Sequence, residues 1–249
     1  MKPAASIATL ISGAILALSA HATCETGLAE RFSAKLHPDA PLDHALAVCE
    51  PWRGVRDHTI VVLPLPHQAV SGLHVYDLDV LVVQRPDNGN SDRDRIVSRF
   101  LDHDALIEGQ NHVTAIRLES TRYRLAHNAY AFGLRVLWRN NDDTAPASSE
   151  QLSLYLPSGR RLIKVLDGLE LDTKHSSPSG NANDNCAARL FTHQRSQLSV
   201  APTSTHGLAD LALQRSQWIT ASPAQDPDSG TCPDPAPPPE QPAKSSQDT

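Results

Sequence analysis

Short apolar runs rich in β-branched residues, separated by turn signals, dominate the chain after residue 58. They include HTIVVLPL, LHVYDLDVLVVQ, YAFGLRVLW and EQLSLYLP, with turns such as Pro157-Ser158-Gly159 between later runs. No amphipathic helical stretch intervenes. About eleven runs at this spacing predict an all-β domain, either propeller-like or a two-sheet sandwich, over residues 58–220.

Alternation within the runs predicts which side chains are buried. Phe132, Leu134, Val136 and Trp138 share one parity and Arg135 lies on the other, so one face of this strand should pack in the core. The run that starts at residue 58 is apolar at consecutive positions, and its two prolines, Pro64 and Pro66, predict its end.

The segment before the strands, residues 23–57, is predicted to be helical or irregular. Leu28, Phe32 and Leu36 recur at i and i+4, which indicates one apolar face of a short helix. The stretch PLDHALAVC predicts a second turn or two of helix.

Both ends of the chain differ from the middle. Residues 1–22 carry Lys2, an apolar stretch and Ala20-His21-Ala22, which predicts a secretory signal peptide and a bacterial periplasmic or secreted location. That stretch is too short for a membrane span, and no later segment is long and apolar enough for one. Residues 221–249 hold eight of the 19 prolines and almost no large apolar side chain, which predicts a disordered Pro-rich tail.

Four cysteines lie in the part of the chain that follows the signal peptide: Cys24, Cys49, Cys186 and Cys232. An even number in an oxidising compartment predicts two disulfides, for which three connectivities exist. The sequence favours the local pairing, Cys24 with Cys49 and Cys186 with Cys232.

The stretch PDNGNSDRD holds the weak metal candidates of the chain, which are Asp87, Asn90, Asp92 and Asp94. A calcium loop of the EF-hand type requires a glycine at position 6 and a carboxylate at position 12, and both possible registers fail. The pair Asn88-Gly89 instead predicts the turn of a hairpin. A calcium site that draws on ligands elsewhere in the chain remains the alternative.

Asp77 and Asp79 are the candidate acids of the chain. Two residues apart on a predicted strand, they should project from the same face, about 7 Å apart. Carboxylates at such separations serve glycoside hydrolysis. Together with Asp102 or Asp104, they carry the hypothesis of an envelope glycan hydrolase.

Arg117, Arg122, Arg124 and Arg135 are candidate residues for binding a partner or an anionic ligand such as a carbohydrate acid. The net charge of −6 and the few aromatic residues argue against nucleic-acid binding. The histidines show no zinc-binding spacing, and His103 and His112 are interpreted as surface residues. The chain lacks the G-x-S-x-G, H-E-x-x-H, Walker A and G-x-G-x-x-G motifs.

Two segments carry a resemblance to known proteins. GLADLAL, with Gly207, Asp210 and Leu211, and YDLDVLVV, with Asp77 and Leu78, are similar to the blade pattern of FG-GAP-type β-propellers. That resemblance implies a propeller fold, but the calcium-binding D-x-D-x-D-G loop of that family is absent. The order of CEPW, AFGLRV, LSLY, VLDGLEL and GLADLAL also resembles a family of uncharacterised secreted proteobacterial proteins, which implies no activity.

These observations favour a non-catalytic secreted or periplasmic binding protein, with an envelope or extracellular protein or glycan as its partner. An envelope enzyme inhibitor or an immunity-type protein is one concrete form. The alternatives are the glycan hydrolase that uses Asp77 and Asp79, and a calcium-stabilised structural module. No cofactor is expected apart from the calcium of the last alternative.

Overall fold

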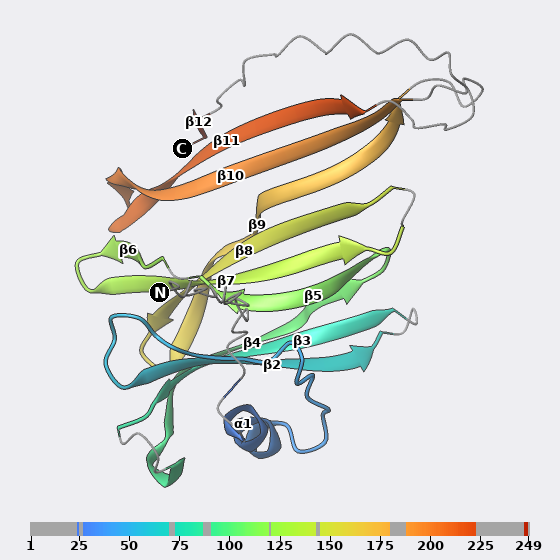
Figure 1. Cartoon of the computed structure of the whole chain (residues 1–249). Coiled ribbons are helices and arrows are strands. Elements are labelled where there is room, and N and C mark those ends of the chain that lie inside the picture. The colour runs from blue at the N-terminus through green and yellow to red at the C-terminus, as the bar shows by residue number, and fades with distance from the viewer. Residues whose placement is uncertain are drawn as a thin grey trace, which may run out of the picture.

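A computed structural model describes residues 24, 27–69, 73–86, 91–119, 121–142, 145–179, 188–222 and 247–248 of the chain (Figure 1). Strands dominate these residues, so the all-β prediction is confirmed. The elements are α1 (Leu28–Leu36), β1 (Val48–Pro51), β2 (His58–Gln68), β3 (His74–Gln84), the short 3-10 helix η1 (Ser91–Arg93), β4 (Arg95–Glu108), β5 (Asn111–Leu118), β6 (Tyr123–Ala126), β7 (Ala129–Asn140), β8 (Ala147–Ser158), β9 (Arg161–Ser179), β10 (Ala188–Thr205), β11 (Leu208–Ser222) and β12 (Gln247–Asp248).

The strands form one continuous and strongly curved sheet. β1 to β4 pair antiparallel in chain order, and β5, β7, β8 and β9 form a second antiparallel series. A short parallel pairing, Arg99 opposite Arg161, joins β4 to β9. The two series therefore face each other as halves of a nearly closed barrel (Figure 1).

β9 belongs to two parts of the sheet. Residues 161–175 pair with β8, and residues 172–179 pair with β10. β10 and β11 continue the sheet as a long hairpin, and β12 pairs with Leu213 and Gln214 of β11. The sheet thus extends beyond the barrel along β9 to β11 (Figure 1).

The interior between the halves is filled by one apolar cluster. Phe132, Leu134 and Val136 of β7 are buried in it, as their alternation predicted, and Trp138 packs against it. Burying these apolar side chains away from water is the main stabilising contribution to such a sheet. The buried members are Leu46, Val48, Ile60, Val62, Tyr76, Leu78, Val80, Val82, Leu106, Val113, Ile116, Phe132, Leu134, Val136, Tyr155 and Leu162.

α1 covers the outer face of β2 and β3. Leu28 and Phe32 form its buried side, as their spacing predicted, and Leu36 packs partly against the same cluster. On the sheet they meet Val61, Leu63, Leu65, Leu81 and Val83. β2 and β3 are therefore buried on both faces, which explains their consecutive apolar residues.

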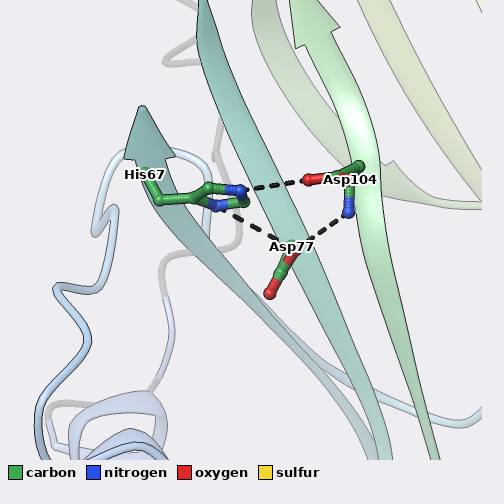
Figure 2. Close-up of side chains that lie close together, drawn as sticks. All are labelled: His67, Asp77 and Asp104. Carbon is green, nitrogen blue, oxygen red and sulfur yellow. Dashed lines mark hydrogen bonds and ion pairs between the residues drawn. The ribbon is translucent and has the colours of Figure 1, made fainter. Parts of the chain in front are cut away.

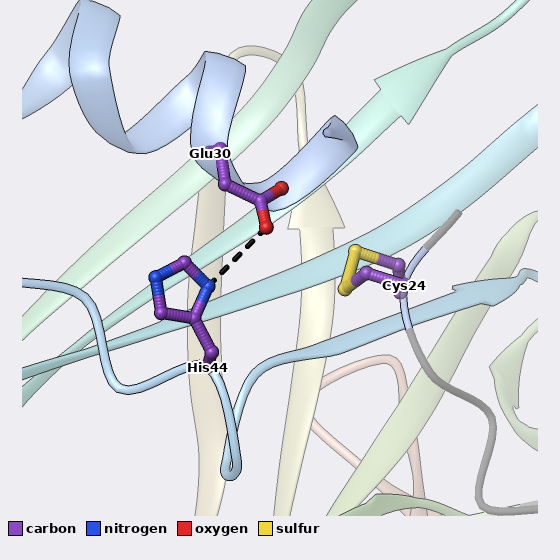
Figure 3. Close-up of a disulfide and its surroundings, with 4 residues drawn as sticks. Cys24, Glu30 and His44 are labelled. Atoms are coloured by element: carbon purple, nitrogen blue, oxygen red, sulfur yellow. Dashed lines mark ion pairs between the residues drawn. A yellow bond between two sulfur atoms is a disulfide. The ribbon is translucent and has the colours of Figure 1, made fainter. Parts of the chain in front are cut away.

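A disulfide joins Cys24 to Cys49 and ties the chain ahead of α1 to β1 (Figure 3). The predicted local pairing is confirmed for these two cysteines, whereas Cys186 and Cys232 lie outside the described residues. Close by, Glu30 of α1 forms an ion pair with His44 in the loop that follows, with 3.2 Å between Oε1 and Nδ1 (Figure 3).

The prediction that β2 ends at its two prolines is wrong, because the strand continues to Gln68. β1 pairs with β2 only as far as Val62, so Pro64 and Pro66 lie where β2 has β3 alone beside it. A sheet edge tolerates proline because no partner needs its missing N–H. The Pro64 carbonyl at this edge accepts a hydrogen bond from the backbone N–H of Asp43 at 3.0 Å.

A third apolar cluster lies on the other face of β7 to β9, beneath β6 and the β10–β11 hairpin. Tyr123 and Leu125 of β6 are buried in it, and Leu198 and Leu211 of the hairpin pack against it. The remaining buried members are Ala131, Leu152, Leu154, Leu156 and Leu171.

The N-terminal segment is helical only in part. α1 confirms the predicted short helix, but the predicted second helical stretch is wrong, since a turn at residues 44–46 leads into β1. Val48 is buried in the barrel interior and Cys49 under α1, so this strand has cores on both faces. No helix in the described part of the chain is long and apolar enough to cross a membrane.

The predictions for the two ends fall largely outside the described residues. The predicted signal peptide, residues 1–22, lies outside them entirely. Of the predicted tail, residues 221–222 belong to β11 and residues 247–248 to β12, and the rest is not described.

The propeller-like alternative is not the arrangement adopted. The described strands form one sheet and not a ring of separate blades. The two propeller-like segments are β3 and the start of β11, which lie at different positions in that sheet. The two halves face each other as in the sandwich alternative, but they belong to one sheet that curves into a nearly closed barrel.

Candidate functional site

Asp79 lies at a buried position on the outer face of β3. Its side chain has no exposed surface, and it accepts hydrogen bonds from Arg99 Nε at 2.9 and 3.0 Å. His37 Nε2, at the end of α1, lies 2.7 Å from Oδ2 of Asp79 and 3.2 Å from Nη2 of Arg99. Both carboxylate oxygens are thus held by cationic or polar groups of the protein. We call Asp79, Arg99 and His37 the closed site.

Asp77 shares that face of β3, as predicted, but has different neighbours. The β3–β4 register passes from Tyr76–Leu106 to Leu78–Asp102, so three consecutive β4 residues oppose Asp77 alone. This bulge brings His103 and Asp104 to the same carboxylate. His103 Nδ1 lies 3.1 Å from Oδ2 of Asp77, and the backbone N–H of Asp104 donates to Oδ1 at 2.9 Å.

His67, near the end of β2, completes this group. Its Nε2 lies 3.0 Å from Oδ1 of Asp104, and its Nδ1 lies 4.0 Å from Oδ1 of Asp77. Figure 2 shows His67, Asp77 and Asp104 converging from three neighbouring strands. We call His67, Asp77, His103 and Asp104 the open site, because all but Asp77 are exposed.

Asp102 does not join Asp77. It forms an ion pair with Lys164 of β9, whose Nζ also lies 2.9 Å from Asp167. Burial alone would lower the pKa of Lys164, but its hydrogen bonds to Asp102 and Asp167 raise it overall. Burial, followed by the two carboxylates, raises the pKa of the neighbouring Tyr155. Of the four acids of the hydrolase hypothesis, the structure therefore brings only Asp77 and Asp104 together.

The candidate calcium loop joins β3 to β4, which form an antiparallel hairpin as predicted. Asp87 and Asn90 lie outside the described residues, and Asp92 lies in η1. The buried carboxylate of Asp94 pairs with Arg31 Nη2 at 3.2 Å and with Arg85 Nε at 3.4 Å. These two guanidinium groups already balance the negative charge of Asp94, as a bound cation would.

The four candidate arginines divide among different environments. Arg135 of β7 forms ion pairs with Glu119 and Glu150 and is thereby neutralised. Arg117 of β5 is exposed directly opposite Arg135, and Arg124 of β6 contacts His127. Arg117 and Arg135 are therefore neighbours across two strands, but Arg135 is already paired with two carboxylates.

Glu119 was not singled out from the sequence, yet it organises this region. Burial would raise its pKa, but hydrogen bonds from the backbone N–H of Thr121 and from Arg135 lower it overall. Its side chain crosses β7 at Gly133, where a Cβ atom would lie 2.7 Å from Cβ of Glu119. A glycine at this position is thus what lets the carboxylate reach Arg135.

A pocket lies at one end of the barrel, between the turn after β1 and the residues after β5. The indole ring of Trp52 meets Phe132 edge-on at 5.6 Å, and its buried Nε1 has no partner among the described residues. Burial raises the pKa of Glu50, and Arg53 opposes that rise. We call it the Arg122 pocket; it is lined by Glu50, Trp52, Arg53, Leu118, Glu119, Thr121, Arg122 and Phe132.

The Arg122 guanidinium is held in place without a carboxylate. Its Cζ lies 4.3 Å above the centre of the Tyr130 ring, a cation–π contact. On another side it lies against Gly54, where a Cβ atom would be 2.0 Å from Nη1. Among the described residues Arg122 has no ion pair. An exposed cation that is restrained and uncompensated is suited to binding an anion.

The hairpin loop of residues 85–95 begins beside the same end of the barrel. The backbone N–H of Arg85 donates to the carbonyl of Asp57, in the turn that also carries Arg53 and Gly54, at 2.7 Å. The start of the β3–β4 loop therefore lies beside the turn against which Arg122 packs. The signal in the sequence was CEPW, whose Glu50 and Trp52 both line the pocket.

Comparisons of the chain with family models, with curated proteins and with solved structures found no match.

Proposed function

We propose that the protein is a non-catalytic binding protein of the bacterial periplasm or the extracellular medium, which holds a carboxylate group of a partner protein at the Arg122 pocket. The observation that carries this proposal is the Arg122 guanidinium, restrained between Tyr130 and Gly54 and without an ion-pair partner in the described chain. Little side-chain freedom is lost when such a group binds, because the fold has already ordered it.

Two further groups of the pocket, Arg53 and Trp52, fit a carboxylate-bearing side chain, and of its two own carboxylates Glu119 is already paired with Arg135. Arg53 is a second exposed cation at the rim. Trp52 lines the pocket with aromatic surface, and its indole N–H is buried without a partner among the described residues. A planar carboxylate can accept two parallel hydrogen bonds from a guanidinium, which gives direction as well as affinity.

The surroundings of Asp79, Asp102 and Glu119 support binding over catalysis at these three acids. Asp79 is bonded to Arg99 and His37, Asp102 to Lys164, and Glu119 to Arg135. A general acid or nucleophile must be reachable by substrate and free to exchange a proton. These three carboxylates instead stabilise the fold.

A location outside the cytoplasm is consistent with the disulfide between Cys24 and Cys49, because such bonds persist in oxidising compartments. The predicted signal peptide supports the same location. An inhibitor of an envelope enzyme, or an immunity-type protein, is the form of partner binding that we favour.

The test is affinity capture from envelope and culture fractions with three forms of the mature, disulfide-intact protein as bait. These are the wild type, Arg122→Gln and the matched control Arg117→Gln, which also removes an exposed arginine without an ion pair in the described chain. Loss of one guanidinium–carboxylate contact should weaken binding by about tenfold to a hundredfold, or about 1.5–3 kcal/mol.

A protein retained by the wild type and by Arg117→Gln, and lost with Arg122→Gln, would support the proposal. Titration of that purified partner should then give the same ranking of affinities. A partner retained equally by all three baits would reject the pocket as its site. Capture of envelope glycan without protein would reject a protein partner.

A further inference from the structure

The open site lies near the connection between β2 and β3. The Arg122 pocket lies by the other end of these two strands, so the proposed function does not use the open site. His67, Asp77 and Asp104 each offer one ligand atom, and these atoms all lie within 4.8 Å of one another. An imidazole nitrogen with two carboxylate oxygens is a donor set that first-row divalent metals bind.

The backbone fixes the three donors independently of one another. His67 and Asp77 are diagonal neighbours on the outer face of paired strands, since Leu65 opposes Asp77 and His67 opposes Val75. Asp104 comes from the bulge of β4, where its φ of 50° is uncommon for a residue other than glycine. The three ligands therefore lie on three separate strands of the folded sheet, so little backbone freedom is lost when a metal ion binds.

The distances are close to those of a metal site. At zinc–ligand lengths of about 2.1 Å, tetrahedral ligand atoms lie about 3.4 Å apart. His67 Nε2 and Asp104 Oδ1 are 3.0 Å apart, whereas Asp77, within 4.8 Å of both ligand atoms, would move closer on binding. His103 contacts the second oxygen of Asp77, which is how outer groups orient a carboxylate ligand.

The charge at the open site also favours a cation. Two carboxylates meet there, and no lysine or arginine of the described residues forms an ion pair with either. At the closed site, by contrast, Arg99 balances Asp79. When the histidines are neutral, the open site carries two uncompensated negative charges.

We propose that His67, Asp77 and Asp104 bind a divalent first-row metal ion, with zinc the best match to the donors, and that His103 orients Asp77. The exposure of the ligands leaves further coordination positions to water. This site is independent of the Arg122 pocket.

The test is isothermal titration of the mature, disulfide-intact protein, freed of any tag, with zinc chloride. The wild type should bind one zinc ion, and His67→Gln should weaken binding by more than about tenfold. The matched control is His74→Gln, since His74, at the same end of the β2–β3 hairpin, contacts a single carboxylate, Glu108, at 3.1 Å. Cobalt(II) absorption in the visible range would report the coordination number.

Asp104→Asn is the second variant, because asparagine tolerates positive φ and the side chain is exposed, so the fold should be kept. It should also weaken zinc binding, whereas His74→Gln should leave it unchanged. The proposal is overturned if the wild type binds no stoichiometric zinc, or if His67→Gln and Asp104→Asn bind it as tightly as the wild type.

Discussion

Asp77 and Asp79 occupy successive positions on one face of β3 and have opposite surroundings. Asp79 is fully buried and bonded to Arg99 and His37. Asp77 keeps about a fifth of its side chain exposed, and its partners are two histidines and the backbone N–H of Asp104. Strand geometry alone makes the two residues equivalent.

The difference comes from what covers each position. The end of α1 supplies His37, and β4 supplies Arg99, to Asp79. At Asp77 the bulge in β4 turns a second carboxylate toward the strand, and no lysine or arginine of the described chain forms an ion pair with either acid. A buried carboxylate with built-in cations contributes to folding, whereas surplus carboxylates at an exposed site favour binding a cation from solution.

The largest effect is expected from removing the disulfide that holds the α1 segment over the closed site. Replacing Cys24 and Cys49 together by serine frees a loop of 25 residues that carries α1. We expect the free energy of unfolding to fall by about 3.5 kcal/mol, measured by urea denaturation. Zinc affinity at the open site should persist, since none of its residues belongs to this loop. A stability equal to that of the wild type would mean that α1 is held by packing alone.

The next effect should come from Asp79→Asn, which leaves Arg99 and His37 without their anion. Because a third of the Arg99 side chain is exposed, we expect the lower end of the cost of breaking a buried pair, about 3 kcal/mol. Asp77→Asn is the control and should change the stability of the metal-free protein by about 0.5 kcal/mol or less. Equal losses in the two variants would contradict the comparison.

Glu119 extends the comparison to a second buried acid with a cation of its own. Its pKa lies below the ordinary value of 4.5, so its stabilising contribution is complete above that pH and is lost as the pH falls through the lowered pKa. Glu119→Gln should cost about 2 kcal/mol at neutral pH and should flatten the loss of stability in acid. Unfolding curves recorded between pH 7 and pH 3 check this, and parallel curves for the two proteins would contradict it.

The smallest effect concerns the open site. Zinc at about ten times its dissociation constant should stabilise the wild type by about 1.4 kcal/mol, seen as a higher melting temperature. Asp77→Asn should abolish that increase, and a chelator should reverse it in the wild type. An increase that survives Asp77→Asn would place the ion elsewhere.

Much of the fold could be predicted from local pattern. Alternation along residues 132–136 identified the buried face of β7, and the spacing of Leu28 and Phe32 identified the buried side of α1. Such periodicities are properties of single strands and helices, so neighbouring sequence is enough to read them. The failures, at Pro64 and in the stretch before β1, occurred where a neighbour in space decided the outcome.

The candidate sites were less predictable for the same reason. The sequence indicated Asp77 and Arg122, but not their neighbours His67 and Tyr130, which come from separate strands. Neither histidine spacing nor motif could reveal a site assembled across three strands, because its ligands are adjacent only through pairing register.

By itself, the sequence determined that the chain is built of β-strands, that one short helix precedes them and that Asp77 and Asp79 share a face. Only the tertiary structure decided that Asp79 is buried beside Arg99 and that Asp77 lies beside Asp104 at an exposed site. Side-chain direction depends on local backbone geometry, whereas burial and charge balance depend on segments far away in the chain.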